Sequence, residues 1–109
     1  MYGWIGVDLD GTLAHYDGWV SIEHIGEPIP LMVNRVLEWI EDGRDVRIFT
    51  ARAAHDPDGN AVGAIEDWCE KYLGKVLPVT NKKDYEMIEL WDDRAIAVEH
   101  NTGRIDHCK

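Results

Sequence analysis

Short apolar runs alternate with helical patterns along this chain. Residues 4–7 (WIGV) are wholly apolar, as in a buried strand, and residues 45–50 (DVRIFT) alternate before an apolar end. Between them, apolar residues recur at helical spacing from Leu31 until Gly43, which predicts a helix facing a core. A second helix is predicted over 61–73, with further strands over 75–79 and 87–91 and a candidate fifth strand over 95–98.

This alternation of strands and helices indicates an α/β fold with a mainly parallel sheet. Residues 13–26 contain no regular period, and glycine and proline interrupt them and the positions that follow, so we predict a flap there. Residues 53–60 (AAHDPDGN) are predicted to be a loop. With no internal repeat and no linker, residues 1–109 are expected to form a single domain.

Polar side chains with catalytic potential follow three of the predicted strands. The carboxyl ends of parallel strands lie at one edge of a sheet, where open α/β sheets bind their ligands. We therefore expect the residues that follow these strands to share one crevice: Asp8 and Asp10, Thr50 and Arg52, and Asp92 and Asp93.

Four carboxylates in one crevice require a positive charge. Two bare carboxylates ~4 Å apart repel each other by about 4 kcal/mol at an effective dielectric constant of 20. A hard divalent cation suits an all-oxygen site, and Mg²⁺ commonly uses only one or two carboxylates together with phosphate oxygens of the substrate. Arg52 and either Lys82 or Lys83 would add fixed positive charge.

Such a site suits phosphoryl transfer. A carboxylate beside Mg²⁺ can attack phosphorus and form an aspartyl-phosphate, which divides hydrolysis into two displacements. A second carboxylate is then needed to move protons. Asp10, two residues beyond Asp8 at the end of the strand, is the candidate for that role.

Four segments of the chain resemble, in order, the four motifs of the haloacid dehalogenase (HAD) superfamily of phosphohydrolases. They are DLDGT at 8–12, the threonine in RIFTAR, a lysine in TNKKDY, and the paired aspartates in ELWDDRA. The resemblance implies a three-layer Rossmann-like fold. Since the chain has no room for the cap domain of larger members, it resembles a capless member in which residues 13–26 are the flap.

The resemblance also implies roles for individual residues. Asp8 would be the nucleophile and a Mg²⁺ ligand, and Asp10 the acid and base that also ligates through its backbone carbonyl. Thr50 would hold the phosphoryl group, and Gly11 and Thr12 would complete the phosphate-binding turn. Lys83 is the better match to the motif lysine, with Lys82 as the alternative. Asp92 would ligate the metal, and Asp93 would do so directly or through water.

The spacing of GRDVRIFTAR and WDDR also resembles the phosphatase domain of phage polynucleotide kinase, a nucleic-acid 3'-phosphatase. That resemblance implies a phosphate-binding role for Arg52. The substrate would be a phosphorylated small molecule, a nucleotide or a 3'-phosphate end. An open site could also borrow a neighbouring subunit as its lid, which would make the protein a homo-oligomer.

Composition narrows the choice of partner and compartment. The formal net charge of -10 is adverse to extended nucleic acid. The sequence has no apolar run of membrane-spanning length and no secretory leader pattern, so a cytoplasmic protein without membrane association is expected. Cys69 and Cys108 lack the spacing of a zinc site or a disulfide framework, which favours free thiols.

Other interpretations of the same residues remain open at this point. Asp8 and Asp10 alone could cap a turn, Thr50 could be a plain strand residue, and Arg52 could be a surface arginine. In a second functional class, the chain would be a non-hydrolytic phosphoacceptor or binding module that keeps the metal site. Asp10 followed by Gly11 and Thr12 favours the hydrolase, because a phosphoacceptor needs no proton carrier there.

Overall fold

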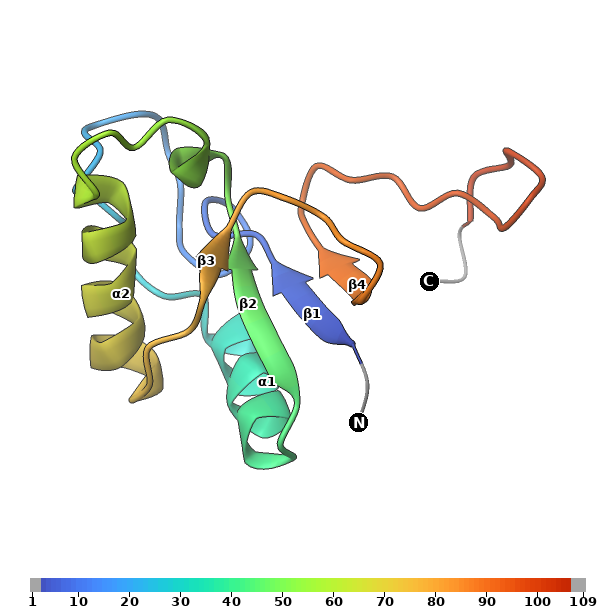
Figure 1. Ribbon diagram of the computed structural model, residues 1–109, viewed down its shortest axis with the longest axis horizontal. Helices are drawn as coiled ribbons and strands as arrows, with labels where there is room; N and C mark the ends of the chain where they lie inside the picture. The colour runs from blue at the N-terminus through green and yellow to red at the C-terminus, as the bar shows by residue number, and fades with distance from the viewer. Residues whose placement is uncertain (1–2, 107–109) are drawn as a thin grey trace.

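The structure is a computed structural model and describes residues 3–106 (Figure 1). Its sheet contains four strands in the order β3-β2-β1-β4, and every neighbouring pair is parallel. This arrangement of a parallel sheet with two helices is Rossmann-like, as the alternating pattern predicts. The strands and helices are β1 (Trp4–Val7), α1 (Pro30–Glu41), β2 (Asp45–Phe49), α2 (Asn60–Leu73), β3 (Val79–Thr80) and β4 (Met87–Trp91).

The register of the sheet determines where the site forms. β1 lies between β2 and β4, and its last residue, Val7, is opposite both Ile48 and Trp91. All four residues of β1 are buried, which explains why this strand is apolar without alternation. Because the three strands end level with one another, the residues that follow them lie at one edge of the sheet.

The two helices are close to the predicted positions. α1 begins at Pro30, which needs no hydrogen-bond acceptor in the first turn, and Gly43, with φ of 77°, lies in the turn just beyond its end. α2 ends at Gly74, which adopts a left-handed conformation. Both helices bury their apolar stripes in one core with β1 and β2, and the fully buried members of that core include Ile5, Val7, Leu9, Leu13, Val36, Ile48, Ile65 and Cys69.

Two predicted strands differ from the structure. The strand predicted over 75–79 contains only Val79 and Thr80, because Leu77 turns into the core and Pro78 has no N–H to donate to a ladder. The candidate fifth strand over 95–98 is absent within residues 3–106; Val98 forms only an isolated antiparallel bridge with Ile105. In Figure 1 the chain after β4 runs away from the sheet, so these residues have no strand to join. The loop predicted over 53–60 is also shorter, since 51–54 form a 3-10 turn.

The flap, residues 13–26, is joined at its base. The His15 N–H donates to the Glu27 carbonyl at 2.8 Å, and the Ile29 N–H donates to the Leu13 carbonyl at 2.8 Å. The indole N–H of Trp68, on α2, donates to the Gly26 carbonyl at 2.9 Å. The flap is therefore a closed loop fastened to α2, with exposed side chains from residue 15 to residue 21.

The fold bears on the state of the cysteines and on whether a helix could cross a membrane. Cys69 is a free thiol, and burial raises its pKa to about 11, so it is a core residue and a poor nucleophile. Cys108 lies outside the described residues. Neither of the two α-helices formed within residues 3–106 has the combination of length and apolar character needed to cross a membrane.

Candidate active site

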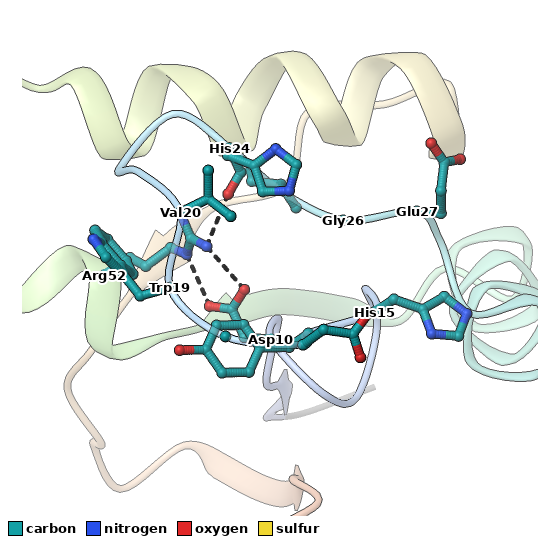
Figure 2. Close-up of a pocket in the computed structure, with 12 residues that line it drawn as sticks. Asp10, His15, Trp19, Val20, His24, Gly26, Glu27 and Arg52 are labelled. Atoms are coloured by element: carbon teal, nitrogen blue, oxygen red, sulfur yellow. Dashed lines mark hydrogen bonds and ion pairs between the residues drawn. The ribbon is translucent and has the colours of Figure 1, made fainter.

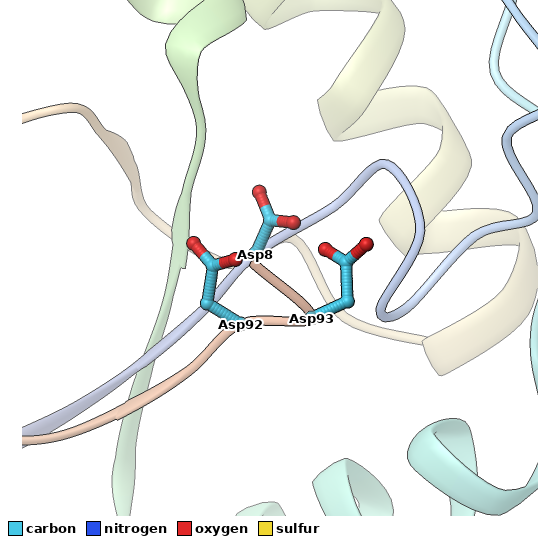
Figure 3. A group of neighbouring side chains, drawn as sticks. All are labelled: Asp8, Asp92 and Asp93. Carbon is cyan, nitrogen blue, oxygen red and sulfur yellow. The ribbon is translucent and has the colours of Figure 1, made fainter. Parts of the chain in front are cut away.

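Three carboxylates gather where β1 and β4 end (Figure 3). Asp8 follows β1, and Asp92 and Asp93 follow β4; each offers an oxygen within 4.8 Å of the others. The Asp8 N–H donates to the Trp91 carbonyl at 2.9 Å, which holds the two chain segments together just beyond the last paired residues. We call these three residues the acidic triad.

Thr12 and Gly11 fit the turn around this triad. The Thr12 hydroxyl lies 3.3 Å from a carboxylate oxygen of Asp8 and 3.2 Å from one of Asp93, and it accepts the Asp93 N–H at 2.9 Å. Gly11 has φ of 88°, and a β-carbon there would lie 2.6 Å from an Asp93 oxygen. Both residues therefore shape the triad directly, and the Thr12 hydroxyl is already engaged by it.

The position of Asp8 in the triad disfavours its ionised form. Burial, followed by the negative charge of Asp92 and the neighbouring Asp93 carboxyl, raises the pKa of Asp8 from 3.8 to about 7, and the Thr12 hydroxyl opposes the rise. Within residues 3–106 no lysine or arginine forms an ion pair with the triad. The three carboxylates therefore form an uncompensated all-oxygen donor set.

That donor set fits a divalent cation such as Mg²⁺. Mg²⁺ takes oxygen ligands from one or two carboxylates and fills its other positions with water or phosphate oxygens. A cation there would favour the ionised form of Asp8, which the surrounding carboxylates and burial disfavour. Asp8, Asp92 and Asp93 are the residues that would hold it.

The raised pKa of Asp8 predicts a pH-dependent stability for the metal-free protein. A folded-state pKa above the ordinary value means that the folded chain binds this proton more tightly, so the stabilisation is complete below pH 3.8 and is lost as pH rises to about 7. Three pKa units correspond to about 4 kcal/mol, and partial solvent exposure of Asp8 reduces our expectation to about 2 kcal/mol. Urea unfolding at several pH values should show this loss in the wild type relative to Asp8→Asn.

Addition of Mg²⁺ provides the control for the urea unfolding measurement. Saturating Mg²⁺ should restore the stability of the wild type near pH 7 and should change Asp8→Asn much less, because the cation binds the folded state through Asp8. Parallel pH profiles of the two proteins without metal would contradict the assignment of the raised pKa to Asp8.

Asp10 lies outside the triad, in an ion pair with Arg52 (Figure 2). Nε and Nη2 of Arg52 donate to the two carboxylate oxygens of Asp10 at 2.8 and 3.0 Å. Asp10 lines the same cavity as Asp8, as expected, but Arg52 binds both of its carboxylate oxygens, a pairing that the sequence did not predict. Arg52 therefore compensates Asp10, and none of its ion pairs involves the triad.

Arg52 also binds the flap. Its Nη1 donates to the carbonyls of Ser21 and Ile22 at 3.4 and 3.0 Å, and its Nη2 donates to the carbonyl of His24 at 2.9 Å. The residue is only 8% exposed. The alternative of an ordinary surface arginine is therefore wrong: Arg52 ties the end of β2 to Asp10 and to the flap.

Thr50 directly follows β2 at the expected edge of the sheet. It is 2% exposed, and its hydroxyl accepts the N–H of Arg52 at 3.2 Å, which starts the 3-10 turn over 51–54. Thr50 also lines the cavity described below. The residue thus serves as a cap and borders the site at the same time.

The two candidate lysines are not brought to the triad. Lys82 and Lys83 lie exposed between β3 and β4, and neither lines the cavity that contains Asp8. The choice between them stays a prediction. Asn81 lines this cavity instead, directly after β3.

The cavity above the triad has a volume of about 710 Å³. Tyr16, Asn81 and Arg94 line it as well, and the sequence patterns did not indicate them as site residues. Arg94 follows Asp93 directly, and Asn81 follows a strand whose end we predicted one residue too early, so strand ends were again the relevant signal. The lining also includes Asp8, Asp10, Trp19, Ile22, Phe49, Thr50, Arg52, His55, Asp92 and Asp93.

Comparison with known proteins supports the fold. No family model and no curated protein matches the sequence. A solved structure described as a conserved protein from Bacteroides thetaiotaomicron is similar, with a TM-score of 0.61 and 21% sequence identity. The similarity covers 87% of this chain and 78% of the other. At this identity it shows a shared α/β fold.

Proposed function

We propose that this protein is a Mg²⁺-dependent phosphomonoesterase of the HAD type that works through an aspartyl-phosphate. The observation that carries the proposal is the acidic triad, in which Asp8, the first residue of DLDGT, meets Asp92 and Asp93 from β4. The triad has no cationic partner within residues 3–106, and the cavity above it is of ligand size. These features together favour a metal-assisted phosphoryl transfer over a structural acidic patch.

In the proposed reaction Asp8 is the nucleophile. One of its carboxylate oxygens forms a bond to phosphorus while the bond from phosphorus to the ester oxygen breaks, and that oxygen takes a proton from Asp10. Water then attacks phosphorus, Asp10 accepts its proton, and the bond between Asp8 and phosphorus breaks to release inorganic phosphate. Bound Mg²⁺ would supply the positive charge that allows anionic Asp8 to approach an anionic phosphate.

Asp10 can perform this role only if its pair with Arg52 opens. In the structure both carboxylate oxygens of Asp10 accept hydrogen bonds from Arg52, so the pair must open before Asp10 can exchange a proton with the substrate or with water. Donation of a proton to the leaving oxygen requires that Asp10 is protonated and turned toward the substrate. The proposal therefore includes movement of Asp10 away from Arg52 during the first step.

The remaining positive charge would come from the rim of the cavity. Arg94 lines the cavity beside Asp92 and is the candidate on the described surface for contact with a phosphate oxygen. Lys83, or Lys82 in its place, could reach the phosphate only by movement of the exposed segment between β3 and β4. Thr50 lies close enough to line the same cavity and is proposed to hold the phosphoryl group.

A substrate panel tests the proposed function. It should include nucleotides, sugar phosphates and 3'-phosphorylated oligonucleotides, each assayed for phosphate release with Mg²⁺ and with a chelator. We expect turnover of at least one monoester that requires Mg²⁺ and is lost in Asp92→Asn. Absence of Mg²⁺-dependent phosphate release from every member of the panel would overturn the proposal.

One observation favours the second candidate, a phosphoacceptor or binding module without hydrolysis. Arg52 binds both oxygens of Asp10, and a phosphoacceptor would have no need to release them. The two candidates differ in the lifetime of the phosphorylated protein. Mass spectrometry after treatment with a small phosphodonor should show a short-lived adduct that Asp10→Ala prolongs if the protein is a hydrolase, and a stable adduct that Asp10→Ala leaves unchanged if it is not.

A further inference from the structure

Trp19 is a large aromatic side chain that the flap holds in solvent. It is 60% exposed, and its ring contacts Arg52, whose guanidinium carbon lies 5.1 Å from the ring centroid. Arg52 also binds the carbonyls of Ser21, Ile22 and His24, so the segment that follows Trp19 is anchored to the same side chain. Figure 2 shows Trp19 beside Arg52, with Arg52 bonded to Asp10 and to the His24 carbonyl.

A second exposed aromatic residue borders the same space. Tyr16 is 47% exposed, and both Tyr16 and Trp19 line the cavity of about 710 Å³ that contains the acidic triad. They also line a neighbouring cavity of about 600 Å³ on the flap. Val20, the adjacent exposed apolar residue of the flap, lines only the neighbouring cavity. The flap therefore brings two aromatic side chains to the space above Asp8.

The two exposed aromatic side chains and the cavity beside them favour a small ligand that carries a flat ring. An exposed indole in contact with an arginine offers a planar surface on which a flat ring can stack. The cavity lies within the range of volumes, about 300 to 1,000 Å³, that small-molecule sites occupy. The net charge of -10 opposes a polyanion, so a single phosphorylated unit is favoured over an extended strand.

We propose that Trp19, with Tyr16, is a specificity-determining surface that stacks on a planar ring in the leaving group, so that the preferred substrates are nucleoside monophosphates over simple sugar phosphates. The inference rests on the proposed phosphatase function for the position of the phosphate at the triad. Under this proposal the flap determines which class of phosphomonoester is preferred, whereas the triad determines only where the phosphate binds.

The test compares adenosine monophosphate with ribose phosphate, which lacks the planar base. We expect wild-type kcat/KM to favour the nucleotide, and Trp19→Leu to reduce that preference roughly tenfold, which is within the range found for loss of one stacked base. Trp19→Phe should retain most of the preference because a planar ring remains. A purely structural role for Trp19 would lower both kcat/KM values together and leave their ratio unchanged, which would overturn the inference.

Val20→Ala is the matched control, since it shortens the neighbouring exposed side chain on the same flap and should keep the wild-type ratio. If the wild type hydrolyses neither compound, calorimetric binding to the same unmodified protein tests the stacking surface separately, while the wider substrate panel decides the proposed function. Tighter binding of the adenosine monophosphate than of ribose phosphate, lost in Trp19→Leu, would support the surface. Equal binding of the two compounds would refute it.

Discussion

Asp8→Asn should reduce phosphomonoesterase activity by at least about a thousandfold while the folded protein remains intact. The amide has nearly the same shape as the carboxylate, but it is a poor nucleophile and a weaker metal ligand. The substitution also removes one of three crowded negative charges, so the metal-free variant should be no less stable than the wild type near neutral pH. Phosphate release with saturating Mg²⁺, together with a urea unfolding curve, measures both effects.

Asp58→Asn is a suitable control for this experiment. Asp58 is exposed in the loop before α2 and does not line the cavity, so its loss should leave activity close to that of the wild type. Asp8→Asn that keeps more than a tenth of the activity would show that Asp8 is not the nucleophile. A variant that loses activity and also fails to fold would instead assign a structural role to Asp8, and the unfolding curve separates these two outcomes.

Arg52→Met should destabilise the protein by about 3 kcal/mol. The substitution leaves the Asp10 carboxylate without its bidentate partner and removes the donor to the carbonyls of Ser21, Ile22 and His24. Because the side chain of Arg52 is only 6% exposed, water cannot easily replace these contacts. Urea unfolding measures the loss of stability, and hydrogen exchange of residues 21–24 should show faster exchange in the variant.

Two further variants determine where this effect comes from. Arg47→Met breaks half-exposed ion pairs with Asp45 and Asp84 and a contact with the Trp4 ring, and it should cost about 1 kcal/mol. Adding Asp10→Asn to Arg52→Met should recover part of the lost stability, since the unpaired charge is removed. If Arg52→Met costs no more than Arg47→Met, the flap is not held in the way described.

The main features of the fold follow from local patterns. The apolar run of β1, the stripes of α1 and α2, and the glycines at 43 and 74 predict these elements within one or two residues. β3 is the exception. Its length depends on Leu77, which enters the core, and that contact cannot be inferred from the short apolar run of residues 75–79.

The acidic triad was only partly predictable from the sequence. The sequence predicts that Asp8, Asp92 and Asp93 follow strands, and parallel pairing with level ends then brings them together. The same argument would have found Asn81 if the end of β3 had been predicted correctly. The raised pKa of Asp8, in contrast, depends on burial and on the exact distance of its neighbours.

By itself, the sequence determined the α/β fold, the order of its main elements and the three aspartates of the candidate metal site, because hydrophobic period and strand ends are local properties of the chain. Only the tertiary structure decided that the Asp10 carboxylate is bound by Arg52, and that Arg52 also binds the flap and contacts Trp19. The direction of a side chain is decided by its partners in space. For Asp10 that partner lies 42 residues further along the chain, where no local pattern indicates it.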